Sequence, residues 1–199
     1  MAPAKVNYKI YQGTTFKQVY RWETDTKYYA NIQSISKSAP CIITTSAAHS
    51  IPPGWRIKIT NVGGMKEINS ASDDDYYFNN AVTASTITIN SINSTGYTTY
   101  TSGGTVEYYA PYPLQYYSAV LQIRANVNSD AIILALNSSA GGGIVLDTTT
   151  STITVTLTAQ QTALFDFTTA VYGMELTDTS GVVTPFITGN ITVVKDVIR

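Results

Sequence analysis

A single cysteine and a single histidine are the residues of this chain best suited to nucleophilic or acid–base chemistry. Cys41 lies in an apolar run that follows Pro40, eight residues before His49. A reactive thiol needs a lowered pKa, which a nearby cation, a histidine or a helix N-terminus can supply. No such group accompanies the run, so the pattern predicts a buried, unreactive cysteine. With only one cysteine, a disulfide within the chain is excluded.

His49 has no partner residues at a spacing that would suit catalysis or metal binding. Such a role would need carboxylate or cysteine side chains placed to share the proton or the metal. A lone histidine at the end of a strand more often caps a turn through a ring hydrogen bond. The sequence therefore predicts a structural turn at His49.

Two other motifs could bind a ligand, but both lack the residues that binding needs. The acidic run Asp73, Asp74 and Asp75 has neither the alternating ligands nor the central glycine and distal glutamate of a calcium loop, which favours a solvated loop. The glycines at 141–143 are not followed by Lys-Ser/Thr, so they predict a hairpin tip and no phosphate loop. We expect no catalytic, metal-binding or cofactor-binding residue, no cofactor and no enzymatic activity.

Tyrosine is abundant, with 15 copies, and many of them occur as adjacent pairs. Exposed tyrosine favours protein interfaces, because the ring offers a large contact area with a polar tip. It can also stack on sugar rings. At least half of these residues are expected to pack across strands instead. The candidates for an interface or a domain junction are Tyr28, Tyr29, Tyr108, Tyr109 and Tyr112.

The charge of the chain gives no electrostatic drive toward nucleic acid or anionic membranes. Its 199 residues carry a net charge of −1, only 13% of them are charged, and no Lys/Arg cluster offsets this locally. The N-terminus lacks the apolar run of a signal peptide, and no stretch approaches the ~20 apolar residues that span a bilayer. We expect neither nucleic acid nor membrane as a partner.

Strand signals are short and frequent, and they alternate with turn residues. A hairpin is expected around Asp178 and Gly181, since glycine adopts positive φ at little cost. One short helix, with Thr158 as its cap, is expected over residues 158–164. This pattern is typical of all-β sandwiches and barrels.

The middle of the chain, residues 28–111, resembles a small β-barrel module that recurs as an insertion in bacteriophage virion proteins. The module is similar to the first catalytic-cysteine half-domain of ubiquitin-activating enzymes. The resemblance rests on the spacing of His49, Gly54, Gly63 and Gly103. That half-domain does not carry the catalytic nucleophile, so the resemblance implies no activity.

The flanking parts resemble phage tail and baseplate proteins with an immunoglobulin-like β-sandwich. The resemblance rests on a glycine turn at residues 11–16, on strand patterns at 113–124 and 152–157, and on a closing pair at 171–177 and 183–193. It implies that the chain opens with a strand pair around the glycine turn. Gly173 and Pro185 depart from the family pattern, and Pro185 predicts an edge or a bulge in its strand.

Together these observations predict an all-β protein with an immunoglobulin-like β-sandwich and an inserted small β-barrel domain. The sandwich is expected to comprise residues 1–27 and 112–199, and the barrel residues 28–111. The resemblance implies a phage virion structural protein of the tail, baseplate or tail-fibre attachment region, made in the host cytoplasm. Its partners would be other virion proteins in a symmetric, multi-copy assembly. A capsid decoration or head-fibre protein, and a module that binds host glycans, are the alternatives.

Overall fold

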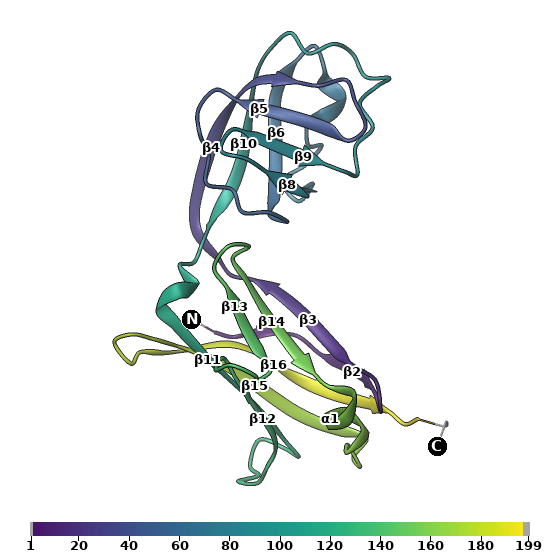
Figure 1. Cartoon of the computed structure of the whole chain (residues 1–199), viewed down its shortest axis with the longest axis vertical. Coiled ribbons are helices and arrows are strands. Elements are labelled where there is room, and N and C mark those ends of the chain that lie inside the picture. The colour runs from purple at the N-terminus through teal and green to yellow at the C-terminus, as the bar shows by residue number, and fades with distance from the viewer. Residues whose placement is uncertain (1, 197–199) are drawn as a thin grey trace. The chain divides into compact units, whose positions relative to one another are not determined.

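Short strands joined by tight turns make up most of residues 2–196, the part of the chain that the computed structural model describes (Figure 1). The predicted all-β fold class, with a sandwich and a barrel-like module, is confirmed. The strands divide into two units, one formed by Met1–Arg21 with Pro113–Arg199 and the other by Trp22–Tyr112. This division lies at Trp22 and Tyr112, whereas the sequence places the inserted domain at 28–111.

The first boundary differs because residues 23–27 do not end a strand, as their polarity suggested. They begin β4 (Glu23–Ile35), which pairs with β10 (Ser102–Pro111) in an antiparallel ladder that reaches from Asn31 to Glu23. Most side chains between Glu23 and Tyr29 are exposed, so the strand has no apolar face there. An ion pair between Lys27 and Glu107 joins the two strands instead.

The sandwich unit has two layers (Figure 1). In the larger sheet, β16 lies between β15 on one side and both β1 and β2 on the other, and the order continues from β15 to β11 and β12. In the smaller sheet, β14 lies between β13 and β3. The strands are β1 (Ala4–Lys5), β2 (Tyr8–Tyr11), β3 (Phe16–Arg21), β11 (Tyr117–Arg124), β12 (Ile132–Asn137), β13 (Ile144–Asp147), β14 (Thr152–Leu157), β15 (Thr169–Asp178) and β16 (Val183–Val194).

The two strands on either side of the glycine turn, β2 and β3, do not form the pair that the resemblance implied. β2 runs parallel to β16 in the larger sheet, and β3 pairs with β14 in the smaller one. The turn between them, with Gly13 at φ 77, therefore carries the chain from one layer to the other. Tyr8 of β2 and Tyr20 of β3 share a hydrogen bond between their hydroxyl groups, which joins the layers across the core.

The glycine run at 141–143 is a second crossing between layers and not a hairpin tip. It joins β12 of the larger sheet to β13 of the smaller one. The crossing is tight, because a Cβ on Gly142 would lie 2.1 Å from the Oδ1 atom of Asn137. A hairpin follows this crossing, formed by β13 and β14.

Several local predictions are confirmed. Thr158 caps α1 (Ala159–Ala163) in a capping box with Gln161. Asp178 accepts hydrogen bonds from the backbone N–H groups of Ser180 and Val182, which holds the expected turn at Gly181. Opposite β15, β16 carries a bulge next to Pro185.

The inserted unit is a strongly curled seven-stranded sheet in the order β7-β6-β10-β4-β5-β9-β8. The two ends of this order, β7 and β8, are separated in the chain by only Asn79 and Asn80, so the sheet must curl until its ends approach each other. Buried isoleucines and the fully buried Trp55 fill the interior. Its other elements are β5 (Cys41–Thr45), β6 (Arg56–Gly63), β7 (Tyr77–Phe78), β8 (Ala81–Val82) and β9 (Thr86–Ile89), and the 3-10 turns are η1 (Lys66–Ile68) in this unit and η2 (Leu114–Tyr116) in the sandwich.

Candidate functional site

The cysteine is buried in the barrel, as predicted. Cys41 has no exposed surface, and its Sγ atom lies 3.8 Å from the carbonyl oxygen of Ser36. Burial raises the pKa of the Cys41 thiol, which keeps it protonated and a poor nucleophile. This side chain therefore contributes packing to the core.

The histidine has the predicted turn role, with both ring nitrogens in use. The Nδ1 atom of His49 accepts a hydrogen bond of 3.2 Å from the backbone N–H of Ile51. The Nε2 atom lies 3.4 Å from the carbonyl oxygen of Thr86, to which it donates. Burial lowers the pKa of His49, which favours the neutral ring that this pair of bonds requires.

The acidic run forms a loop that is braced by its neighbours. Asp73 makes an ion pair with Lys58, and an Oδ2 oxygen of Asp75 accepts from the backbone N–H of Ala71. Within residues 2–196, no group of three or more His, Cys, Asp or Glu side chains is placed to hold a metal ion. No helix in that part of the chain is long and apolar enough to cross a lipid bilayer.

Three of the five candidate tyrosines line one hollow on the barrel. Tyr28 on β4 lies directly opposite Tyr108 on β10, with ring centroids 5.8 Å apart. Tyr108 is 6% exposed, while Tyr28 is 51% exposed and Tyr29 is 63% exposed. The hollow lies between this part of β4 and the loop formed by residues 46–50.

The other two candidates lie elsewhere. Because successive side chains of a strand point to opposite faces, Tyr109 points away from the side of the sheet that Tyr108 occupies. Its ring lies 5.2 Å from the Nζ atom of Lys27 and 5.5 Å from the guanidinium of Arg56. Tyr112 stacks on Trp22 with ring centroids 3.9 Å apart.

An ion-pair network surrounds Tyr109, and the sequence patterns did not predict it. The Nε atom of Arg56 donates to both carboxylate oxygens of Glu23 at 2.8 Å, and the guanidinium lies 4.7 Å from the ring of Tyr76. A second pair joins Lys27 of β4 to Glu107 of β10. A third joins Lys58 of β6 to Asp73 in the loop before β7. The alternation of Arg56 and Lys58 with buried isoleucines was the available signal, but their partners depend on strand register. Each of the three pairs is neutral as a unit.

The larger sheet of the sandwich ends in an edge that lacks the usual protection. β12 has one neighbour, β11, and among the described residues its outer edge is met only by an isolated bridge between Asn137 and Gly143. It runs for six residues without charge or proline, and Ile132 and Ile133 are exposed on it. Natural sheets blunt such edges with charges, prolines or very short strands. The other edges follow this rule, since β1, β7 and β8 have two residues each and β2, β3 and β13 carry charges.

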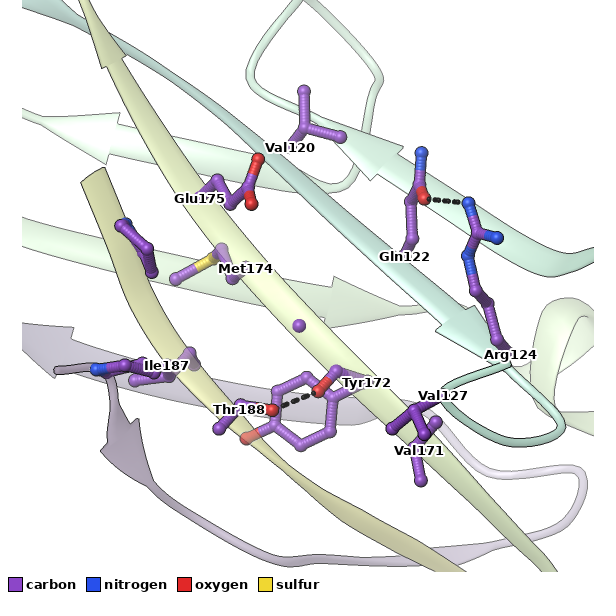
Figure 2. Close-up of a pocket in the computed structure, with 13 residues that line it drawn as sticks. Val120, Gln122, Arg124, Val127, Val171, Tyr172, Met174, Glu175, Ile187 and Thr188 are labelled. Atoms are coloured by element: carbon purple, nitrogen blue, oxygen red, sulfur yellow. Dashed lines mark hydrogen bonds between the residues drawn. The ribbon is translucent and has the colours of Figure 1, made fainter. Parts of the chain in front are cut away.

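Next to this edge, the outer face of the same sheet is hollowed. Figure 2 shows Val120, Gln122 and Arg124 of β11 along one side of the hollow, whose volume is about 420 Å³. Gly173 lies between Gln122 and Thr188 in the ladder, and a Cβ there would meet no atom within 4 Å. Arg124 donates to the Oε1 atom of Gln122 at 2.8 Å and to the carbonyl oxygen of Ser129 at 2.7 Å. The missing side chain at Gly173 therefore leaves an open depression in an ordered face.

Comparison with known proteins finds no family model that matches the chain and no curated protein that is significantly similar to it.

Proposed function

We propose that this chain is a structural protein of a phage virion, located in the tail, the baseplate or the region where tail fibres attach. It acts by protein–protein assembly and not as an enzyme. The immunoglobulin-like character of the sandwich and the phage origin come from the sequence resemblance. Low charge adds support, because a weakly charged surface costs little to desolvate on contact with another protein.

The observation that carries the proposal is the unprotected edge of β12. Five uncharged residues, 132–136, whose outward backbone groups pair with no strand are a template for another strand. A protein that stays monomeric would be expected to block this edge. We propose that a strand from a neighbouring virion subunit extends the sheet there, with main-chain hydrogen bonds giving affinity.

A ring of identical copies makes such an edge effective. Each added strand contributes only a few hydrogen bonds, and a single contact of this size is weak. In a symmetric assembly the contacts repeat, so that modest affinities combine. The sandwich would then be the attached part of the molecule, and the barrel would be available for a second partner.

The test compares two lysine substitutions in the sandwich. Ala135→Lys places a charge on the exposed side of β12, and Val120→Lys places the same charge on the exposed face of the interior strand β11. We expect Ala135→Lys to reduce incorporation into particles about tenfold, which corresponds to ~1.4 kcal/mol, and Val120→Lys to change it little. Quantitative mass spectrometry of purified particles measures both.

Three results would count against the proposal. Absence of the wild-type chain from purified particles would contradict the virion assignment itself. Normal incorporation of a folded Ala135→Lys variant would show that the β12 edge is not used, even if the chain belongs to the particle. Equal loss with both variants would assign the contact to the face of the sheet and not to its edge.

A further inference from the structure

The hollow between β4 and residues 46–50 has the dimensions of a small-molecule site. Its volume is about 440 Å³, within the range of ~300–1,000 Å³ that is usual for ligand pockets. It lies within the barrel unit and is separate from the β12 edge. Its lining is formed by Tyr28–Asn31 of β4, by residues 46–50 and by Tyr108.

The lining carries no charged side chain. It consists of tyrosine, alanine, asparagine, serine and His49. His49 is held neutral, since burial lowers its pKa and both ring nitrogens already have backbone partners. A charged ligand would therefore find no counter-charge in this hollow, which favours a neutral one.

Tyr28 supplies an apolar platform. Its ring packs against Tyr108 at 5.8 Å between centroids, yet about half of its surface remains exposed. The side chain is thus braced from the barrel side while part of the ring stays open. A pyranose ring has a matching shape, because one of its faces presents C–H groups and its rim presents hydroxyls. An aromatic ring with nearby hydrogen-bonding groups suits both parts.

Polar groups surround that platform. The exposed side chains of Asn31, Ser46 and Ser50 lie beside it and can both donate and accept hydrogen bonds. The Oγ atom of Ser46 is 3.3 Å from the carbonyl oxygen of Asn31, and its lone pairs remain available to a ligand hydroxyl.

The loop that carries these groups is fixed before any ligand arrives. The backbone N–H of Ser46 donates to the carbonyl of Asn31 at 2.9 Å, and the hydroxyl of Thr45 donates to the carbonyl of Ala47 at 2.7 Å. The backbone N–H of His49 donates to the carbonyl of Ala84 at 2.8 Å. A site ordered in this way loses little conformational entropy on binding.

We propose that this hollow binds a neutral hexose unit of a glycan, stacked on Tyr28 and hydrogen-bonded by Asn31, Ser46 and Ser50. This inference does not depend on the assembly role of the sandwich. If both proposals hold, the sandwich unit attaches the chain to the particle and the barrel unit recognises a surface glycan.

The test is an NMR titration of the isotope-labelled full chain with neutral trisaccharides of glucose, galactose, mannose and N-acetylglucosamine, each to about 10 mM. Weak, millimolar binding by at least one of them is expected, with shifts centred on residues 28–31 and 46–50. Tyr28→Ala should weaken binding about tenfold. Tyr28→Phe keeps the stacking face and should bind nearly as well as the wild type.

Tyr116→Ala is the matched control, because Tyr116 is also half exposed, at 55%, but lies in the sandwich unit. It should bind the sugar as the wild type does. The proposal is overturned if none of the four sugars shifts the residues of the hollow. It is equally overturned if Tyr28→Ala binds unchanged, or if the shifts centre on the sandwich.

Discussion

Both ring nitrogens of His49 hold a turn. The stability of the barrel therefore depends on pH through the protonation of this ring. The unfolded ring has a pKa of about 6.5, whereas burial lowers the pKa in the folded barrel. As the pH falls below the unfolded value, the unfolded chain takes up a proton that the folded chain resists. The contribution of His49 to stability is therefore complete above pH ~6.5 and is lost as the pH falls through the folded pKa.

We predict that replacing His49 with asparagine removes this pH dependence while keeping the turn. The side-chain oxygen of asparagine can accept the same hydrogen bond from a backbone N–H two residues later, and it does not titrate. The chain has no other histidine, so the difference between wild type and His49→Asn in the slope of unfolding free energy from pH 7 to pH 5 reports on this site. Denaturant unfolding at several pH values measures it. An unchanged slope in His49→Asn would contradict the assignment.

At the scale of the elements, close backbone approaches decide which substitutions the sandwich tolerates. Gly189 of β16 faces the segment between β1 and β2, and a Cβ there would lie 1.8 Å from the carbonyl oxygen of Val6. The whole N-terminal segment runs parallel to β16 on both sides of this point, from Ala4 to Tyr11. A side chain at Gly189 must push it away.

We predict that Gly189→Ala destabilises the sandwich by about 1–3 kcal/mol, because the backbone of Val6 cannot move without breaking its ladder. Gly173→Ala is the matched control, since Gly173 is a strand glycine in the same sheet with open space around it. It should be neutral or slightly stabilising, as alanine loses less backbone entropy on folding. Thermal unfolding compares the two, and similar melting temperatures would contradict the argument.

The elements also show where sequence patterns stop being informative. The cap at Thr158, the turn at Asp178 and the bulge at Pro185 depend on neighbours within a few residues, so they could be predicted. The separation of β2 from β3 and the crossing at Gly142 depend on which sheet each strand joins. The Arg56–Glu23 pair likewise depends on the register across three strands. The alternation of side chains along a strand could have placed Tyr108 and Tyr109 on opposite faces of the sheet. The hollow beside Tyr28 could not be predicted in this way, because residues 46–50 of another segment also line it.

At the scale of the whole molecule, the two ends of the inserted unit meet. The backbone N–H of Tyr112 donates to the carbonyl of Trp22 at 3.0 Å, and the two rings stack. An insertion whose ends lie this close can be removed without stretching the host domain. Each unit also has its own hydrophobic core, and that of the barrel includes Trp55.

We predict that both units fold on their own. Residues 22–112 expressed alone, and residues 1–21 joined to 113–199 by a short Gly-Ser linker, should each unfold cooperatively. Circular dichroism should show β structure, and NMR should show dispersed amide signals. A collapsed or unfolded product from either one would mean that the units depend on each other for stability.

The most direct test of the assembly role is an electron-microscopy reconstruction of the particle that contains this chain. We expect several symmetry-related copies, each with a strand from a neighbouring subunit paired along residues 132–136. We also expect that the Tyr28 hollow remains open at the particle surface. A reconstruction in which β12 faces solvent in every copy would rule out strand addition at this edge.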